Sequence, residues 1–393
     1  MILYLISGRG FTRSNSGRKI SEVLHCFNEV VETDVLFGGD IPKERNVPSI
    51  SSKSDYHAKW YRKNRFVLFF SDSFAEMKCL VHNHLTYNCI KKKGKNYELI
   101  WERSSTLHWA GILYAKRRGI PSVLEWKDHL IKDYLTLFRP LAILVEKWKV
   151  NNASFITVES RVLKDDLVKS GIPGDKIYIT YNAVNPEEFY KDEQDGKSVR
   201  KELGFSETDL IVGYVGSYAF YHDSIRMVLA ASILKNKGID SIKWLLIGDG
   251  KDRPICEHYA KDHDLLGNSI VMLPFQAKER IPRYLSAMDV TILPGSTDII
   301  CPIKVMEYMA AKSVVLVPDY KCNREVINEG NGLLFEPGNE NSIAEILEDL
   351  NENRFRCRVL GENARKTVVQ SLTWDKTYGA VLSDILGKLN LMK

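Results

Sequence analysis

Cysteine is scarce in this 393-residue sequence and is not arranged for metal binding or cross-linking. The seven cysteines are scattered, their number is odd, and none forms a C-x-x-C pair. This pattern excludes an ordinary disulfide framework and the common zinc-ribbon classes. We expect reduced, structural thiols in a reducing compartment.

Long hydrophobic runs are also missing. No apolar stretch reaches the roughly 18–20 residues that a membrane-spanning helix needs. The first residues, MILYLISGRGF, are apolar but lack a basic leader region and a small-residue cleavage site. They therefore predict a first strand and not a signal peptide. We expect a cytoplasmic protein, possibly peripheral on the inner face of the cytoplasmic membrane.

An excess of one charge is absent as well. There are 55 Lys and Arg residues against 50 Asp and Glu, a net charge of +5. This mild value does not require a nucleic-acid partner and is compatible with anionic small molecules. Two basic segments, 56–66 and 90–96, suit contact with an anionic membrane surface or a lipid-diphosphate acceptor. Solvated loops are the alternative interpretation.

What the sequence does contain is a regular alternation of apolar runs typical of strands with helix-like segments. Such runs indicate parallel sheets covered by helices on both faces, and two sets of them indicate two Rossmann-like domains in an α/β protein. We expect an N-terminal domain over 1–184, a charged linker over 185–207 and a C-terminal domain over 208–373. An amphipathic helix over 374–393 then crosses back to the first domain. The predicted strands are ILYLIS, YELIWE, PSVLEW and SFITVES, then LIVGYVG, KWLLIGDG, IVMLPF, VTILPG and VVLVPD.

The first loop, SGRGFTRSNSG, follows a predicted strand and opens a predicted helix. It carries Gly8, Gly10 and Gly17, but Arg13 stands where a dinucleotide fingerprint requires glycine. The fingerprint therefore fails, and an oxidoreductase is disfavoured. The loop is either a tight turn or a backbone cradle for a phosphate or sugar.

A second glycine-bearing loop, GYVGSYAFYHDSIR, follows the first strand of the C-terminal half. Gly216 ends that strand, while His222 and Arg226 lie at the start of the next helix, where free N–H groups attract anions. His222 is either a ligand contact or a capping residue. Gly248 in LLIGDGKDR repeats the strand–glycine pattern and is either a turn former or a ligand contact.

The segment PIKVMEYMAA at 302–311 places a cation where a helix is already positive. Pro302 is predicted as the first helical residue, with Lys304 in the first turn and Glu307 one turn later. A bound diphosphate would be stabilised by Lys304 and the helix end, while the carboxylate accepts hydrogen bonds from ribose hydroxyls. A salt bridge between these two side chains on a solvated face is the alternative.

Taken in order, these segments resemble the retaining GT4-type glycosyltransferases, which have the GT-B fold. The resemblance rests on VGSYAFYH, LLIGDG, IPRYLSAMDVTILPG, PIKVMEYMAAKSVVLVPD and REVINEGNGLLFEPGN, supported by WERSSTLHWAGILYAKRRGIPSVLEWKDHL and ITVESRVLKDDLVKSGIPGDKIYITYNAVNPEEF. It implies two Rossmann-like domains whose sheets face each other across a cleft. It also implies transfer, with retention, of a sugar from a UDP- or GDP-type donor to the hydroxyl of a glycan or lipid-linked acceptor, in cell-envelope polysaccharide synthesis. No metal or other cofactor is expected.

The resemblance implies a set of site residues. Glu307 would bind the donor ribose and Lys304 would assist the diphosphate. In EWKDHL, at the end of a predicted strand, Glu125, Asp128 and His129 are alternatives for contact with the transferred sugar or the acceptor. The remaining expected donor contacts are Gly216, Ser217, His222, Arg226, Gly248, Phe275, Asp298, Ile303 and Val305.

Two positions depart from the family pattern. The usual E-x7-E signature would place a glutamate at 299, where this chain has Ile299, and Ser217 replaces the usual arginine. His222, Arg226, Lys304 or loop arginines are the expected substitutes for that charge. The lost glutamate leaves two alternatives open: a non-catalytic nucleotide-sugar or glycan-binding protein, and a GT-B epimerase or phosphorylase.

Overall fold

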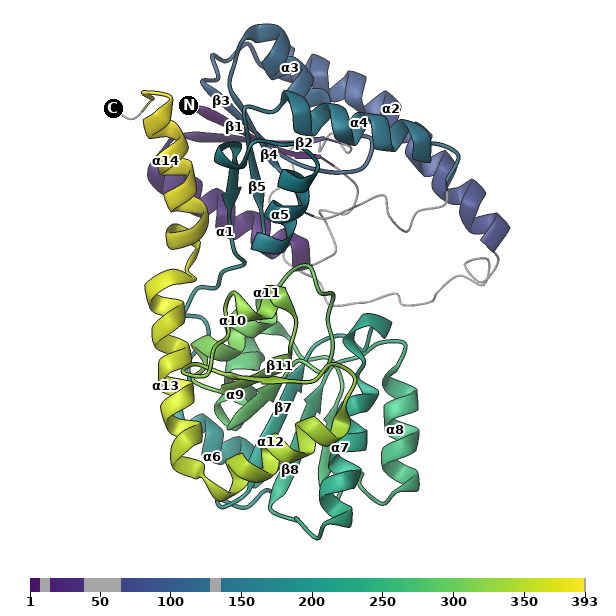
Figure 1. Cartoon of the computed structure of the whole chain (residues 1–393), viewed down its shortest axis with the longest axis vertical. Helices are drawn as coiled ribbons and strands as arrows, with labels where there is room; N and C mark the ends of the chain where they lie inside the picture. The colour runs from purple at the N-terminus through teal and green to yellow at the C-terminus, as the bar shows by residue number, and fades with distance from the viewer. Residues whose placement is uncertain (8–14, 39–64, 128–135, 392–393) are drawn as a thin grey trace. The chain divides into compact units, whose positions relative to one another are not determined.

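The computed structural model describes residues 1–7, 15–38, 65–127 and 136–391 (Figure 1). The chain forms two compact units. Unit 1 comprises Met1–Thr180 together with Tyr378–Lys393, and unit 2 comprises Tyr181–Thr377. The expected α/β class is confirmed, because each unit is built on one six-stranded parallel sheet.

The sheet of unit 1 has the order β2-β1-β3-β4-β5-β6, with every described pair parallel. Its central strands are apolar and buried along nearly their whole length, as expected for a parallel sheet with helices on both faces. The strands are β1 (Ile2–Ser7), β2 (Thr33–Gly38), β3 (Leu99–Arg103), β4 (Ser122–Glu125), β5 (Phe155–Val158) and β6 (Ile177–Ile179).

Six α-helices lie in the part of unit 1 that the structure describes. The longest, α2, carries three lysines in its last turn and packs beside α3. The final helix α14 packs near α1 and follows a π-helical turn at Asp375–Gly379. The helices are α1 (Asn15–Val30), α2 (Arg65–Lys93), α3 (Ala110–Arg118), α4 (Arg139–Asn152), α5 (Arg161–Lys169) and α14 (Ala380–Lys388).

The sheet of unit 2 has the order β12-β11-β10-β7-β8-β9 and is again parallel. Alternate residues of its strands enter two separate cores: Leu210 and Val212 of β7 join one, and Ile211 joins the other. This alternation puts helices on both faces. The strands are β7 (Leu210–Val215), β8 (Ile242–Ile247), β9 (Ile270–Leu273), β10 (Val290–Ile292), β11 (Val314–Pro318) and β12 (Leu333–Phe335).

The helices of unit 2 divide between the two faces. Helices α7 and α12 pack together, as do α10 with α13 and α6 with α9 (Figure 1). Short 3₁₀ turns at Gly174–Lys176 (in unit 1), Phe220–His222 and Lys278–Arg280 connect elements. The α-helices are α6 (Glu193–Glu202), α7 (Ile225–Asn236), α8 (Arg253–Asp262), α9 (Ile281–Ser286), α10 (Ile303–Ala310), α11 (Lys321–Arg324), α12 (Glu340–Glu352) and α13 (Arg354–Ser371).

Three local predictions need correction. The segment 185–207 is not simply a linker, because it contains α6, whose N-cap Asp192 accepts a hydrogen bond from the amide of Asp195 and which packs on α9 of the same unit. Pro302 is the N-cap of α10 and not its first helical residue, since its backbone is extended (φ −68°, ψ 148°). The basic segment 90–96 begins inside α2 and is not a loop throughout.

Candidate functional site

In each sheet the strand order reverses beside the first strand, and such reversal points are where open α/β sheets bind ligands. In unit 2 the reversal lies between β7 and β10. The carboxyl ends of these strands lead to Gly216 and Gly295, and the first turn of α10 lies at the same edge. The predicted donor residues Gly216, His222 and Lys304 all gather there.

The amino end of α10 has no internal cap. Its N-cap residue is a proline, which offers no side-chain hydrogen bond, and no acidic residue lies in the first turn. Ile303, Lys304 and Val305 form that turn, whose backbone N–H groups have no partner within the helix, apart from the amide of Val305, which donates to the carbonyl of Pro302. This helix end is therefore suited to an anion.

Lys304 is held at this helix end by two side chains from the β7 side of the site. Its Nζ lies 3.3 Å from Nε2 of His222 and 3.4 Å from the hydroxyl of Tyr214, over whose ring it also sits at 4.9 Å from the centroid. Burial lowers the pKa of Lys304 to about 8, and the charge of Glu307 only partly opposes this lowering. A buried ammonium group of this kind would be stabilised by an anionic ligand.

The tautomer of His222 follows from its partners. Nδ1 lies 3.1 Å from the carbonyl of Gly295, which can only accept, so Nδ1 carries the hydrogen and Nε2 presents a lone pair to Lys304. Burial and the nearby ammonium group lower the pKa of His222 to about 4. The imidazole is therefore neutral at pH 7 and acts as an acceptor that orients Lys304.

Three glycines of this site are closely packed against neighbouring groups. A Cβ on Gly216 would lie 2.3 Å from Nζ of Lys304, and one on Gly295 would lie 2.9 Å from the backbone of His222. Gly248 has φ +140°, and its Cβ would lie 1.9 Å from the carbonyl oxygen of Gly216. This close approach favours the interpretation of Gly248 as a packing and turn glycine, the first of the two alternatives that its sequence pattern left open.

Glu307 lies one turn after Lys304 and is half-buried. Its neighbours along α10 are mostly buried apolar residues. Two tyrosines that sequence reasoning missed support the site. Tyr214 orients Lys304 and donates to the carbonyl of Ser217, and Tyr308 bonds to both backbone groups of Val215. The sequence carries no sign of these roles, because Tyr214 contacts Lys304 and Tyr308 contacts Val215 across about 90 residues of chain.

Arg226, which was predicted to contact the donor, is paired with two carboxylates of unit 2. Its guanidinium group pairs with Asp223 at 2.8 Å and with Glu340 at 2.6 Å. These two carboxylates raise the pKa of Arg226 and satisfy its charge within the fold. The geometry thus favours a structural role in joining α7 to α12, and not that of a spare cation for the donor.

The other predicted donor residues lie in loops of unit 2. Ser217, Phe275 and Asp298 are exposed to solvent. Their side chains are accessible to a ligand, but packing in the core does not fix their positions. The amide of Phe275 donates to Asp249 at 2.8 Å, which fixes its loop. Ile299, in place of the first signature glutamate, is half-buried.

In unit 1 the predicted residue Glu125 is buried at the end of β4. It pairs with Arg103 at 2.5 Å and accepts hydrogen bonds from the hydroxyl of Tyr4 and the indole of Trp101. These contacts favour a structural role for Glu125 over direct contact with a substrate.

A second buried pair lies beside this one. Lys19 of α1 contacts Glu159 at 2.8 Å, and its Nζ lies 5.1 Å from the centroid of the Tyr378 ring. Lys127, half-buried just after β4, has its pKa lowered to about 8 by burial and by the Arg103 charge. Sequence reasoning overlooked this cationic group, although it lies within EWKDHL, between the predicted residues Glu125 and Asp128.

Several predicted residues lie outside the described part of the chain: Gly8, Gly10, Arg13, Asp128, His129 and most of the basic segment 56–66. Gly17 is described and lies in the first turn of α1. A dinucleotide-binding protein also needs an acidic residue at the end of its second strand, but Asp34 lies at the start of β2 and is paired with Lys93 and Lys95. Asp34 thus lies at the amino end of its strand, whereas ligands of open α/β sheets bind at the carboxyl ends.

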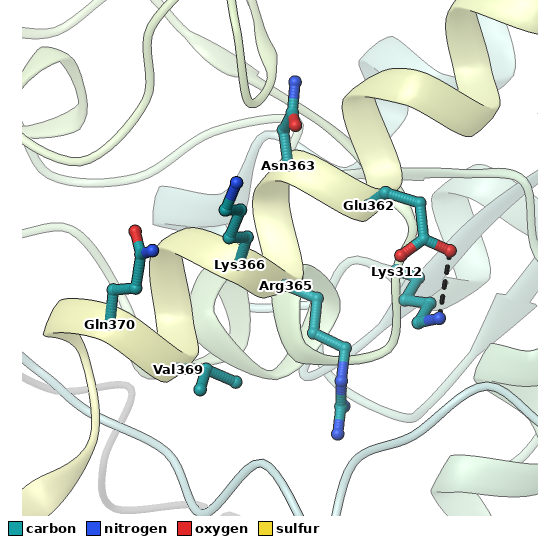
Figure 2. A pocket seen from close by; sticks show the side chains of 7 residues that line it. All are labelled: Lys312, Glu362, Asn363, Arg365, Lys366, Val369 and Gln370. Carbon is teal, nitrogen blue, oxygen red and sulfur yellow. Dashed lines mark hydrogen bonds and ion pairs between the residues drawn. The ribbon is translucent and has the colours of Figure 1, made fainter.

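A surface hollow of unit 2, along α13, offers an alternative location for a ligand (Figure 2). Two of its cations are engaged within the fold, since Lys312 pairs with Glu362 at 2.9 Å and Arg365 donates to the carbonyls of Pro186, Phe189 and Ala310. The hollow therefore lacks the buried, oriented cation that marks the amino end of α10.

Two family models match the chain. The model for Glycosyl transferases group 1 matches residues 195–367, and the model for Glycosyltransferase Family 4 matches residues 47–188. Together with the fold, these matches indicate the GT4/GT-B class of glycosyltransferases.

Two curated relatives are similar to parts of the chain. The protein EpsD of Bacillus subtilis (strain 168) is 28% identical over 174 residues, which cover 44% of each chain. An uncharacterized glycosyltransferase of Methanocaldococcus jannaschii is 27% identical over 227 residues, or 56% of each chain. The matches thus span about half the length of these relatives.

Solved structures share the fold over nearly the whole chain. A glycosyltransferase from Rickettsia africae has a TM-score of 0.73 at 16% identity, covering 99% of this chain and 98% of its own. HepE of Anabaena, solved with UDP and glucose, has a TM-score of 0.71 at 13% identity, covering 98% and 100%. Sucrose-phosphate synthase of Thermosynechococcus elongatus scores 0.71 at 16% identity, covering 99% and 100%. The GT-B fold is thereby confirmed.

None of the described helices is long and apolar enough to cross a bilayer. Among the same residues, no group of three or more His, Cys, Asp or Glu side chains is arranged to hold a metal ion.

Proposed function

We propose that this protein transfers a sugar, with retention of anomeric configuration, from a nucleoside diphosphate sugar to a hydroxyl group of a glycan or lipid-linked acceptor. The observation that carries the proposal is the position of Lys304. Its ammonium group is held by His222 and Tyr214 at the uncapped amino end of α10, with Glu307 one turn later.

The diphosphate of the donor would bind at this helix end. It would receive hydrogen bonds from backbone N–H groups and the charge of Lys304, in an environment that already disfavours an unpaired cation. During transfer the bond between the anomeric carbon and the diphosphate oxygen breaks, and the acceptor oxygen bonds to that carbon. The acceptor proton leaves with the diphosphate. The helix end and Lys304 would stabilise the negative charge that grows on the departing group.

The nucleoside would be held by Glu307, whose carboxylate can accept two hydrogen bonds from the ribose hydroxyls. A uridine donor is favoured over guanosine by the Anabaena neighbour, which was solved with UDP and glucose. No step of this reaction requires a metal ion, because the helix end and Lys304 supply the charge stabilisation.

The acceptor would bind to unit 1, where the strand order reverses between β1 and β3. The buried pair of Arg103 and Glu125 shapes this edge of the sheet, and Lys127 adds a cation within the EWKDHL segment. Asp128 and His129 stay the proposed contacts to the transferred sugar. Synthesis of a cell-envelope polysaccharide or glycolipid on the cytoplasmic side is the proposed setting.

Calorimetric titration of the full chain with UDP and GDP tests the donor site. Lys304→Met and Glu307→Ala should each weaken diphosphate binding by about tenfold or more, which corresponds to the 1–3 kcal/mol of a charge-assisted hydrogen bond. The matched control variants Lys251→Met and Glu329→Ala change exposed residues of unit 2 and should bind as wild type does. Wild-type affinity in both site variants would refute the assignment.

A second function is favoured by Ile299, which replaces the first signature glutamate: binding of a nucleotide sugar without turnover. Product analysis after incubation with a panel of nucleotide sugars, with and without extracted acceptor lipids and glycans, separates the two. Transfer only when acceptor is present supports the proposed enzyme. Binding without donor consumption across the panel supports the second function, and donor conversion without acceptor indicates an epimerase.

A further inference from the structure

Helix α2 of unit 1 exposes large apolar side chains at helical spacing. Phe70, Phe74, Met77, Val81 and Leu85 all have 43–69% of their surface accessible. Their spacing of three and four residues puts them on one face of the helix. Isolated exposed apolar residues are common on proteins, but a continuous stripe of five large ones indicates a surface that contacts an apolar partner.

Helix α4 adds a second stripe of the same kind. Leu141 and Leu144 of α4, together with Leu137 two residues before the helix, follow the same three- and four-residue spacing, and Leu137 and Leu144 are 67% and 65% exposed. A cluster formed by Cys79, Leu107 and Ala142 packs the two helices over one loop. The hydroxyl of Ser73 in α2 also accepts a hydrogen bond from the amide of Leu137 at 3.0 Å. These contacts bring α2 and the start of α4 together within unit 1 (Figure 1), and we call the exposed residues of the two stripes the apolar face.

The exposed charged side chains that the structure describes on these two helices are all basic. Lys78, Lys91 and Lys92 are exposed on α2, and Lys147 is exposed on α4. Among the side chains of these two helices that the structure describes, no exposed position is acidic. Lys78 also covers the ring of Phe74, with Nζ at 4.8 Å from the centroid. The surface thus combines apolar insertion with positive charge.

This charge pattern distinguishes the possible occupants of the face. Helices that pair in solution normally flank their apolar seam with both acidic and basic residues, which form salt bridges across the interface. A second copy of this chain would instead bring lysine against lysine. An anionic bilayer matches both properties, because its acyl boundary accepts the apolar side chains while its headgroups attract the lysines.

We propose that the apolar face of α2 and α4 binds the surface of a bilayer that contains anionic phospholipid, with the two helices lying in the plane of the interface. The proposal does not depend on the glycosyltransferase activity proposed above. It uses Lys91 and Lys92 of the basic segment 90–96, whereas Lys93 and Lys95 of that segment are paired with Asp34. It also assigns a contact surface to helices that have no other described role.

Sedimentation of the full chain with vesicles tests the proposal. Wild type should bind vesicles of phosphatidylcholine and phosphatidylglycerol at a ratio of about 3:1 more tightly than pure phosphatidylcholine vesicles. The double variant Val81→Gln/Leu144→Gln should lower the partition coefficient about tenfold or more, because two apolar side chains that would enter the bilayer are replaced by polar ones. Lys91→Glu/Lys92→Glu should lose about 25-fold or more, at about fivefold for each lysine removed.

Matched controls are available in unit 2. Ile255 and Phe355 are 61% and 69% exposed, close to the 59% and 65% of Val81 and Leu144. Ile255→Gln/Phe355→Gln should bind vesicles as wild type does, and so should Lys251→Glu/Lys261→Glu, which changes two exposed lysines. Thermal unfolding by circular dichroism shows that each variant is folded before it is compared.

Three results would overturn the proposal. Wild type does not bind the anionic vesicles, or the unit 2 controls lose binding as much as the apolar-face variants. The third is a wild-type dimer in analytical ultracentrifugation that Val81→Gln/Leu144→Gln dissociates while vesicle binding is unchanged, which would identify the face as a contact between copies of the chain.

Discussion

The hydroxyl group of Tyr308 makes hydrogen bonds to both backbone groups of Val215. It donates to the carbonyl at 2.9 Å and accepts from the amide at 2.8 Å, so that α10 is tied to the last residue of β7. Because Lys304 is one turn earlier in α10 and Gly216 follows Val215, this link sets the distance between the two sides of the proposed donor site.

Replacing Tyr308 by phenylalanine removes this link without changing the apolar packing of the ring. Two buried backbone groups then lose their partner, at a cost of about 1–3 kcal/mol in the free energy of unfolding. Urea denaturation measures the loss, and calorimetry should show weaker UDP binding as well. The control Tyr284→Phe, whose hydroxyl makes only a 3.5 Å contact to Gln276, should change neither by more than about 0.5 kcal/mol.

A methyl group at Gly216 should displace Lys304 and leave the fold intact. The new Cβ would meet the flexible end of the lysine at 2.3 Å and the hydroxyl group of Tyr214 at 2.9 Å. We expect Gly216→Ala to weaken UDP binding by about tenfold, the effect of one lost charged contact, with a small change in melting temperature. Gly248→Ala is the contrasting variant, because its Cβ meets backbone and its φ is +140°; it should destabilise the protein strongly. Equal melting temperatures for the two variants would contradict this packing analysis.

The pH dependence of stability tests the neutral state of His222. Its pKa is about 4 in the folded protein, lower than the ordinary value of about 6.5, so protonation favours the unfolded state. Stability should therefore fall as pH falls from 6.5 towards 4, by about 1.5 kcal/mol between pH 6.5 and 5 from this group alone. His222→Gln should lack this part of the slope, as measured by urea midpoints. Exposed His258, changed to Gln, serves as the control and should keep the wild-type slope.

A variant of Glu125 tests whether this residue has a structural role or contacts the acceptor. Glu125→Gln removes the partner of the buried Arg103, and leaving such a charge unpaired costs about 3–5 kcal/mol. We expect a large loss of stability in urea denaturation but unchanged UDP affinity at a temperature where the variant is folded. A stable variant that lost only acceptor turnover would instead show that Glu125 contacts the acceptor.

Much of the fold could be predicted from the sequence because parallel strands form short apolar runs between helices. The predicted runs at 210–216 and 314–319 match β7 (Leu210–Val215) and β11 (Val314–Pro318) within one residue. Helix α2 was not predicted, because its apolar residues lie on both its buried and its exposed sides and conceal the helical period. Likewise α6, in a polar and charged stretch, resembled a linker until its packing on α9 was known.

The site could be predicted only where its residues are close in sequence. Lys304 and Glu307 are one helical turn apart, so their pairing with the helix end follows from spacing alone. The contacts of Lys304 with His222 and Tyr214 depend on the order of strands β7 and β10, which no local pattern encodes. The same reasoning explains why Arg226 was predicted as a ligand cation, since its partner Glu340 is 114 residues away.

The central claim is that Lys304, with a pKa lowered to about 8 by burial, receives the diphosphate of the donor. A bound diphosphate would raise this pKa above 10, so the protein should take up a proton on binding.

Calorimetric titration with UDP at pH 8.5, in two buffers with different ionisation enthalpies, measures that uptake directly. The account predicts about 0.7 proton taken up by wild type, because the phosphate groups of UDP, with pKa values near 6, are already fully ionised. It predicts almost none for Lys304→Met. The same uptake in both proteins, or the same UDP affinity, would contradict it.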